Sequence, residues 1–274
     1  MYSLFKEFIV VLKIKNVNME TLTIIKVGGK IVESPESLEK LLMNFSKIKG
    51  YKALVHGGGV IATDIAKKLG IESQMIEGKR VTYADMLQVV TMVYSGVNMQ
   101  IVAGLQAIGV NAIGLNGADM NCIMSEKRPV GDVDYGFVGD VKQVNADALA
   151  NLIKSGIVPV LAPLTHDRKG QILNTNADTI ASEVAKALAK YFEVTLEFCF
   201  DKKGVLRNVN DNESVIPIIT KSDFAELLAN GIIQEGMIPK LENAFRAIDT
   251  GVMQVIITQA EAIHNLDCGT KVIK

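Results

Sequence analysis

The chain has 274 residues, 49% of them hydrophobic, and its 29 basic side chains nearly balance its 30 acidic ones. This length and apolar content allow a sizeable core, in one large domain or two lobes, and exclude an intrinsically disordered chain. Balanced charge without a polybasic tract argues against nucleic acid as the main partner. Three scattered cysteines, Cys122, Cys199 and Cys268, fit neither a zinc site nor a disulfide framework. We therefore expect a cytoplasmic protein without a metal centre.

The first 18 residues contain a short apolar run, residues 8–12, between Lys6 and Lys13. A membrane span needs about 20 apolar residues, and no small-residue cleavage site follows the run. We therefore expect no membrane association and treat residues 1–18 as a dispensable extension. A helix that contacts a partner is the alternative.

Short runs rich in Val and Ile alternate with stretches of helical periodicity. The predicted buried strands are residues 22–27, 53–56, 110–115, 157–161, 194–200 and 252–258. The predicted helices are residues 37–48, 61–69, 84–94, 99–108, 146–154, 179–190, 222–230 and 241–249. This alternation is typical of a mostly parallel sheet with helices on both faces. Turn residues predict antiparallel hairpins within 124–144 and around 167–170.

Two glycine turns follow the first two predicted strands. Residues 26–29 read Lys-Val-Gly-Gly, and residues 56–59 read His-Gly-Gly-Gly. Bare backbone N–H groups beside a fixed cation suit a polyphosphate, and open α/β sheets bind ligands at this end of their strands. The pair of turns therefore predicts a nucleotide-handling enzyme.

Three known glycine motifs can be compared with these two turns. A Walker loop is excluded because the glycines before Lys30 lack its spacing and no Ser or Thr follows. A lipase oxyanion loop is excluded because the chain has no Gly-x-Ser-x-Gly elbow. The dinucleotide fingerprint fits residues 57–62, with Glu77 as ribose ligand, but a lone match on the second strand leaves the first turn unexplained.

Three polar side chains, Asn174, Asn176 and Asp178, stand directly before the helix predicted at 179–190. Asp178 is well placed to cap this helix. Taken alone, Asn176 and Asp178 are better explained as caps for free helix N–H groups than as catalytic groups.

Two basic side chains lie at junctions between loops and helices. Arg80 belongs to Gly-Lys-Arg-Val-Thr at residues 78–82, and Lys240 ends Gly-Met-Ile-Pro-Lys at a helix start. A lysine in a first turn opposes the helix dipole. Lys240 therefore needs an anion nearby or full exposure.

Taken in order, these motifs resemble the amino acid kinase family from about residue 22 to the C-terminus, with Tyr-Gly-Phe-Val-Gly at 135–139 as a further match. Each motif is short, but six in family order and near-family spacing are specific. The resemblance implies a three-layer αβα sandwich, an α/β fold whose mostly parallel open central sheet is flanked by β-hairpins. It also implies an enzyme that uses ATP with Mg²⁺ to phosphorylate the γ-carboxylate of an N-acyl-L-glutamate, acetyl or succinyl, in arginine biosynthesis.

The resemblance assigns roles to particular residues. The catalytic residues that it implies are Lys26, Lys240 and Asp178, the aspartate holding both ammonium groups. The substrate-binding residues that it implies are Gly58, Gly59, Arg80, Asn174 and Asn176. The ATP-binding residues that it implies are Gly28, Gly29, Asp201, Gly204, Leu206, Ile232, Ile233 and Gln234. It further implies a lobe for acyl-glutamate and dimerisation at residues 19–189 and an ATP lobe at 190–274.

Some residues depart from the family pattern. Lys202 and Lys203 replace small and apolar residues in the family's Asp-x-x-Gly turn. Lys127 and Arg128, near the expected acyl group, suit a longer, charged acyl group such as succinyl. His56 is expected to be structural, because nothing needs to be deprotonated.

Other readings remain open at this point. The C-terminus resembles the family's ending without the longer extension of arginine-inhibited members, so we expect an arginine-insensitive homodimer, whereas an ordered helix at 1–18 would predict a hexamer. The competing functions are a sibling kinase acting on glutamate, aspartate or carbamate, and a catalytically silent amino acid sensor.

Overall fold

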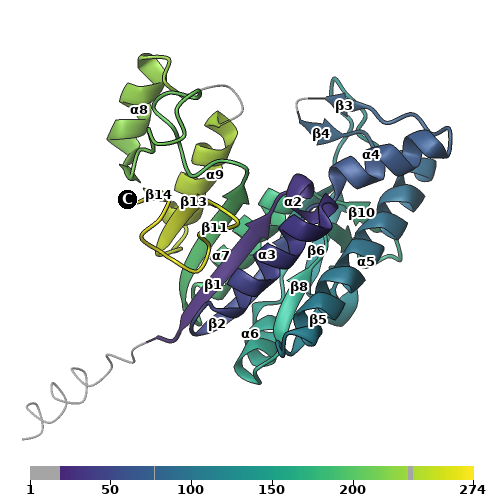
Figure 1. The fold of residues 1–274 in the computed structure, drawn as a ribbon. Coiled ribbons are helices and arrows are strands. Elements are labelled where there is room, and N and C mark those ends of the chain that lie inside the picture. Colours follow the sequence, from purple (N-terminus) through teal and green to yellow (C-terminus); the bar gives the residue numbers. More distant parts are fainter. Residues whose placement is uncertain (1–18, 77, 234–236) are drawn as a thin grey trace, which may run out of the picture.

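The computed structural model describes residues 19–76, 78–233 and 237–274, and the statements below concern these residues. Its centre is an eight-stranded sheet in the order β12-β14-β13-β11-β1-β2-β8-β5 (Figure 1). Its strands are β1 (Thr21–Val27), β2 (Tyr51–His56), β5 (Ala112–Leu115), β8 (Val158–Leu161), β11 (Glu193–Phe200), β12 (Ile218–Ile219), β13 (Gln254–Gln259) and β14 (Thr270–Val272). Only β13 and β14 run antiparallel, so the predicted mostly parallel sheet is confirmed.

Two smaller sheets flank the central one. The first has the order β10-β9-β6-β7, with β6 (Ile123–Lys127), β7 (Gly139–Val144), β9 (Leu164–His166) and β10 (Ile172–Asn174). Its antiparallel pairs, β6 with β7 and β9 with β10, confirm the two predicted hairpins. The second, β3 (Met75–Ile76) with β4 (Lys79–Arg80), is not among the predicted elements, because two-residue strands carry no readable alternation.

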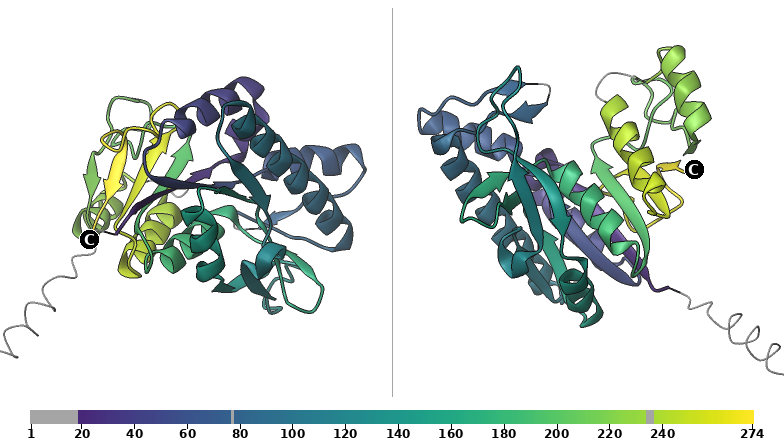
Figure 2. Two further views of the ribbon diagram at one scale, coloured as in Figure 1. Left: turned by 90° about the horizontal axis from the view of Figure 1, so that it is seen from below. Right: turned by 180° about the vertical axis from the view of Figure 1, so that it is seen from behind.

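Helices cover both faces of the central sheet (Figure 2). One face packs against α2 (Gly29–Glu33), α3 (Pro35–Ser46), α4 (Gly59–Lys68) and α5 (Ala84–Ala107). The other packs against α6 (Ala146–Lys154), α7 (Ala177–Leu188), α8 (Lys221–Ala229) and α9 (Ile238–Asp249). A short 3-10 helix, η1 (Asp119–Asn121), precedes β6. Successive strand residues point to opposite faces of the sheet. Ile24 of β1 therefore packs in the core beneath α6–α9, and Ile25 packs in the core beneath α2–α5.

Helix α5 corrects the prediction of two helices at 84–94 and 99–108. It runs unbroken for 24 residues through Ser95 and Gly96, both exposed. A glycine inside a helix costs about 1 kcal/mol, less than is gained by burying residues such as Tyr94, Val97 and Ile101 on the opposite side. Among the described helices, only α5 is long and apolar enough to cross a membrane, judged by length and composition alone.

The two predicted glycine turns lie at one edge of the central sheet. Val27, the last residue of β1, pairs with His56 in β2 and with Cys199 in β11, so these strands end together. The chain leaves β1 toward β2 and later enters β11 on the opposite side, which makes this edge a topological switch point. Figure 1 shows α8 and α9 on one side of this edge and α4 with the β3–β4 hairpin on the other.

Glu197 is a buried carboxyl group in the middle of β11. It is 1% exposed, pairs with Ile25 and Ile256, and its Oε1 has no hydrogen-bond partner among the described residues. Burial raises its pKa from an ordinary 4.5 to about 8. The folded chain therefore retains a proton that the unfolded chain releases, so the free energy of unfolding falls as the pH rises from 4.5 to 8.

We expect Glu197→Gln to raise the free energy of unfolding by about 2 kcal/mol at pH 6 and to change it little at pH 4.5. Urea unfolding at the two pH values measures this difference. Glu193→Gln, on an exposed position of the same strand, is the matched control and should have little effect at either pH. An equal gain for Glu197→Gln at both pH values would contradict the prediction.

Candidate active site

Lys26 and Asp178 form an ion pair at the end of β1. Their Nζ and Oδ1 atoms are 2.7 Å apart, and the two side chains are 10% and 21% exposed. Lys26 follows Ile24 on the face of β1 that packs against α7, and Asp178 lies in the first turn of that helix. The partial positive charge of a helix N-terminus stabilises a carboxylate there. The pair therefore holds one ammonium group at the carboxyl end of the central strand.

Lys240 approaches the same place from the first turn of α9. Its Nζ lies 3.5 Å from the centroid of the Phe200 ring, and the Nζ of Lys26 lies 5.8 Å from that centroid. Burial lowers the pKa of Lys240, and the negative charges of Asp178 and Asp201 oppose this shift. These carboxylates are the anions that a lysine in a first turn was expected to need.

Asp178 pairs directly with Lys26 alone among the described residues. Its predicted contact with Lys240 therefore stays a prediction, for the complex with substrates.

Phe200 is a site residue that the sequence motifs did not single out. It ends β11 on the same face as Phe198, whose ring stacks on it with 6.2 Å between centroids. Aromatic ring faces attract ammonium groups. The available signal was its position, directly before Asp201 and on the strand beside Lys26.

The two glycine turns approach each other closely. A Cβ added to Gly57 would lie 3.3 Å from the backbone nitrogen of Gly29, and one added to Gly58 would lie 3.0 Å from a ring carbon of Tyr94. The N–H of Gly57 donates to the Val27 carbonyl over 3.0 Å. Gly59 opens α4, whose first N–H groups have no partner within the helix. Free backbone donors therefore gather beside Lys26.

Arg80 lies beside the second glycine turn. Its Nη2 donates to the Gly59 carbonyl over 2.6 Å and to the Thr63 hydroxyl over 2.8 Å, and its Nη1 donates to the Ser73 hydroxyl. With 8% exposure, it is not a solvated loop charge. The guanidinium is anchored against the start of α4.

Asn174 ends β10 close to the same position. Its Nδ2 donates to the Thr82 hydroxyl over 2.9 Å, and its backbone N–H donates to the Phe137 carbonyl over 2.9 Å. Thr82 is fully buried and follows the β4 strand that carries Arg80. The flanking hairpins thus bring an amide and a guanidinium to one side of the glycine turns.

Asn176, and not Asp178, caps α7. The Asn176 side chain accepts from the backbone N–H groups of Asp178, over 2.8 Å, and Thr179, over 3.1 Å. Asp178 lies inside the first turn, where its carboxylate is directed to Lys26. The expectation that Asp178 caps the helix is therefore wrong, and its carboxylate is available for the lysine.

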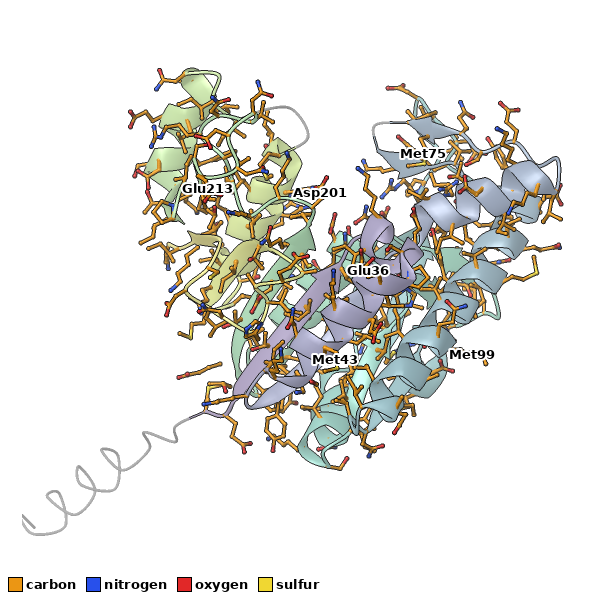
Figure 3. All side chains as sticks on the ribbon, viewed as in Figure 1. Glu36, Met43, Met75, Met99, Asp201 and Glu213 are labelled. Carbon is orange, nitrogen blue, oxygen red and sulfur yellow. The ribbon has the colours of Figure 1, made fainter. Side chains whose placement is uncertain are left out.

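Gly28 and Gly29 follow β1, and the other described residues predicted to bind ATP lie on the β11 side of the edge. Asp201 is exposed, and its Oδ2 lies 3.8 Å from the Nζ of Lys30, which follows the first glycine turn. Figure 3 shows Asp201 on the side of the β11–α9 half that is directed toward the other half. Lys203, one of the departures from the family pattern, is paired with Glu213.

Several of these residues have packing roles in the structure. A Cβ on Gly204 would lie 2.7 Å from the Thr270 hydroxyl. Leu206 is half-buried and bridges to Val215. Ile233 is 5% exposed within the core, and the half-buried Ile232 packs against that core. Gln234, like Glu77 of the dinucleotide reading, lies outside the described residues.

The two basic residues suggested to favour a charged acyl group differ in their surroundings. Arg128 is neutralised by Asp140, with 2.5 Å between its Nη2 and Oδ1, and its guanidinium lies over Tyr135. Lys127 has its Nζ 4.9 Å from the ring centroid of Phe137. Lys127 has no carboxylate partner within the described parts of the chain, so its charge stays uncompensated there, near Phe137, whose carbonyl accepts from the backbone N–H of Asn174.

The geometry suits a small anionic substrate together with a polyphosphate. Two ammonium groups, two turns of free backbone donors and one anchored guanidinium converge at the switch point of the sheet. The described residues hold no group of three or more His, Cys, Asp or Glu side chains that could bind a metal ion.

A model of the amino acid kinase family matches residues 21–259. The acetylglutamate kinase of Parabacteroides distasonis is 68% identical over 247 residues, 90% of this chain and 97% of that protein. The acetylglutamate kinase of Phocaeicola vulgatus is 69% identical over 246 residues, 89% of this chain and 96% of that protein. The carbamate kinase of Giardia lamblia bound to AMP-PNP shares the fold, with a TM-score of 0.68 at 15% identity over 93% of this chain and 99% of its own. With its fold and the match over most of its length, the chain belongs to the amino acid kinase family.

Proposed function

We propose that this protein transfers the γ-phosphoryl group of ATP to the γ-carboxylate of N-acetyl-L-glutamate, in arginine biosynthesis. The observation that carries the proposal is the convergence of the Lys26–Asp178 pair and Lys240 beside two glycine turns. The names of the relatives at 68% and 69% identity support it.

In the proposed reaction a γ-carboxylate oxygen attacks Pγ, the bond from Pγ to the β,γ-bridging oxygen breaks, and ADP leaves with the bonding electrons. No proton has to move, because the carboxylate is already anionic. The difficulty is repulsion between the carboxylate and the triphosphate, together with charge spread over the transferring group. Lys26 and Lys240 offset this charge, and their fixed positions spare the reorganisation that water would need.

The glycine turns and Arg80 are assigned to the other charged groups of the two substrates. Gly28 and Gly29 would bind phosphoryl oxygens, and Gly58 and Gly59 the reacting carboxylate. Arg80 would hold the α-carboxylate through the N–H donors that its bonds to Gly59, Thr63 and Ser73 leave free.

Further contacts complete the proposed complex. Asn174, with help from Asn176, would hold the acylated nitrogen. The ATP-binding set proposed on the other lobe is Asp201, Gly204, Leu206, Ile232, Ile233 and Gln234. Mg²⁺ would enter as MgATP with phosphate oxygens as ligands, the arrangement that Mg²⁺ prefers over a protein cage. Residues 19–189 and 190–274 are the corresponding lobes, which share one sheet through the β1–β11 pairing.

An acylated amino group explains the site better than a free one. The hydrogen-bond partners of the Arg80 and Asn174 side chains are hydroxyl groups and a carbonyl, with no carboxylate among the described residues. A free glutamate or aspartate would bring an ammonium group that needs such a carboxylate. These contacts therefore disfavour the sibling kinases that act on free glutamate or aspartate.

ATP-dependent hydroxamate formation tests the proposal with four acceptors: acetylglutamate, succinylglutamate, glutamate and aspartate. We expect turnover of an acyl-glutamate and at least about tenfold less kcat/KM with either free amino acid, because their ammonium group would be buried unpaired. Absence of activity with all four acceptors would overturn the proposed function.

Succinylglutamate is the second candidate substrate, favoured by the uncompensated charge of Lys127. Lys127→Ala should then lower kcat/KM for succinylglutamate relative to acetylglutamate. Lys142→Ala, which removes an exposed lysine paired with Glu126 on the neighbouring strand, is the control. An unchanged ratio in Lys127→Ala protein would exclude this role.

We propose a cytoplasmic homodimer that associates through the outer face of α5. No charged residue occurs between Asp85 and Asp119. Met92 and Met99, seven residues apart and so on one side of the helix, are 59% and 72% exposed. Figure 3 shows Met99 directed away from the body of the molecule. Exposed apolar patches of this kind mark association surfaces, and three free cysteines agree with a reducing compartment.

Met99→Glu is expected to shift the wild-type dimer to a monomer, because it places a charge in an apolar contact. Size-exclusion chromatography with light scattering measures the mass. Met253→Glu, at a methionine that is 59% exposed before β13, should leave the dimer intact. A monomeric wild type, or a hexamer that Met99→Glu does not alter, would contradict the proposed face.

A further inference from the structure

We propose that His56 is a positioning residue: its ring holds the peptide group that carries the Gly58 N–H, and Asn98 sets the tautomer of that ring. The inference rests on the proposed function, because it concerns a donor assigned to the reacting carboxylate.

His56 lies between the glycine turn and α5. It is the last residue of β2, is 0% exposed, and belongs to the strand face that packs against α5. Its Nδ1 is 2.6 Å from the carbonyl oxygen of Gly57, and its Nε2 is 3.1 Å from Nδ2 of Asn98. Both ring nitrogens are therefore engaged, one by the turn and one by the helix.

The neighbours determine where the ring proton lies. Nδ2 of Asn98 also lies 2.9 Å from the Val160 carbonyl, which can only accept, so the amide nitrogen and not the oxygen faces both groups. An amide nitrogen only donates, so Nε2 of His56 must accept from it. The proton is thereby placed on Nδ1, which donates to the Gly57 carbonyl.

The ring is also neutral under ordinary conditions. Burial lowers the pKa of His56 from 6.5 to about 4. A neutral imidazole has one donor and one acceptor, which matches the one carbonyl and the one amide N–H that it meets. The arrangement leaves no ring nitrogen unsatisfied.

The contact between His56 and the Gly57 carbonyl also fixes the direction of the Gly58 N–H. In a trans peptide group the C=O and the following N–H are coplanar and point in opposite directions. With its carbonyl turned inward to His56, the Gly57–Gly58 peptide presents the Gly58 N–H away from the ring. Glycines have wide backbone freedom, so an outside contact is needed to keep this donor aimed before substrate arrives.

A separate feature of the sheet makes room for Asn98. A Cβ added to Gly114 of β5 would collide with the Oδ1 of Asn98. The neighbouring strand therefore leaves space for a buried amide, 7% exposed, in the middle of α5. The contacts run without a gap from Gly114 through Asn98 and His56 to the Gly57 carbonyl. The peptide group of that carbonyl carries the Gly58 N–H, the proposed donor to the reacting carboxylate.

Nitrogen-15 NMR of the full chain tests the tautomer without reference to activity. The chain has three histidines, and His56→Asn identifies the His56 signals by their loss. We expect a protonated Nδ1, an unprotonated Nε2 and no titration between pH 5 and 8. A proton on Nε2, or titration near the ordinary His value, would overturn the proposal even if the variants below fail to fold.

Kinetics test the consequence. His56→Leu should lower kcat/KM for the acyl-glutamate by about tenfold to thirtyfold and should shift the Gly58 amide resonance. His56→Asn returns an N–H near the position of Nδ1 and should recover most of the loss. Asn98→Asp replaces the donor with an acceptor, so it should move the proton to Nε2 or charge the ring, with a similar loss.

Ile101→Val removes one methylene group from the same buried side of α5 and is the control for lost stability. Equal loss of kcat/KM in His56→Leu and Ile101→Val, or no recovery in His56→Asn, would show a structural role only and overturn the proposal. A wild type inactive on every acyl-glutamate would instead refute the proposed function, and the tautomer measurement separates the two failures.

Discussion

Lys26→Met is expected to lower kcat for phosphoryl transfer by about a thousandfold, with much smaller changes in the KM of either substrate. The reason is geometric: Asp178 holds this ammonium group 2.7 Å away at the end of β1, so its charge is in place when negative charge develops on the transferring group. Methionine keeps the length and apolar stem of the side chain but supplies no charge. Steady-state kinetics with ATP and acyl-glutamate measure the effect.

Two further variants make this test specific. Asp178→Asn should lower kcat in the same direction and by less, because it loosens Lys26 without removing it. Lys40→Met removes an exposed lysine that pairs with Glu36 on the surface of α3 and should leave kcat unchanged. A Lys26→Met enzyme with near wild-type kcat would contradict the two-lysine arrangement.

Arg80→Lys is expected to raise the KM for acyl-glutamate by about tenfold to a hundredfold, with a smaller change in kcat. The guanidinium has five N–H donors, of which three bond to the Gly59 carbonyl, the Thr63 hydroxyl and the Ser73 hydroxyl, so two remain for a carboxylate. A lysine ammonium has three donors on a single nitrogen, so it cannot keep these three bonds and also bind a carboxylate, and the exchange is not conservative. Initial rates over a range of acyl-glutamate concentrations measure the KM.

The matched control is Arg168→Lys. Arg168 is an exposed arginine bonded to Asn121 and Gln143 at a hairpin tip, and we expect no change in the KM for acyl-glutamate. If Arg80→Lys leaves this KM unchanged while the enzyme is active, Arg80 does not hold the substrate.

Much of the fold was predictable because buried parallel strands are continuous apolar runs. The strands β1, β2, β8, β11 and β13 carry such runs, and the helices between them carry the periodicity that places them on the two faces. Elements without a pattern of their own escaped prediction. These are the two-residue strands β3, β4 and β12, the five-residue helix α2, and the three-residue strand β14. Short elements are stabilised by neighbours distant in the chain, which a local window does not contain.

The site residues divide in the same way. Lys26, Asp178 and Arg80 were predicted from the order of short motifs, although a single motif would have favoured a cap or a surface charge. Phe200 and Asn98 were not predicted, because no motif marks them. Their importance comes from contacts across the fold, such as the bond between His56 and Asn98, which are 42 residues apart in the chain.

The sequence by itself determined an α/β chain with two glycine turns at the ends of buried strands and an ordered set of cationic and polar residues near them. Strand alternation and helix periodicity are local properties, so they survive without the folded structure. The tertiary structure alone decided that Asn176 and not Asp178 caps α7, that Phe200 faces both lysines, and that the Gly57 carbonyl is held by His56. Those outcomes depend on which faces of β1, β2 and β11 meet α5, α7 and α9, and this is settled only when the sheet and its two helical layers pack together.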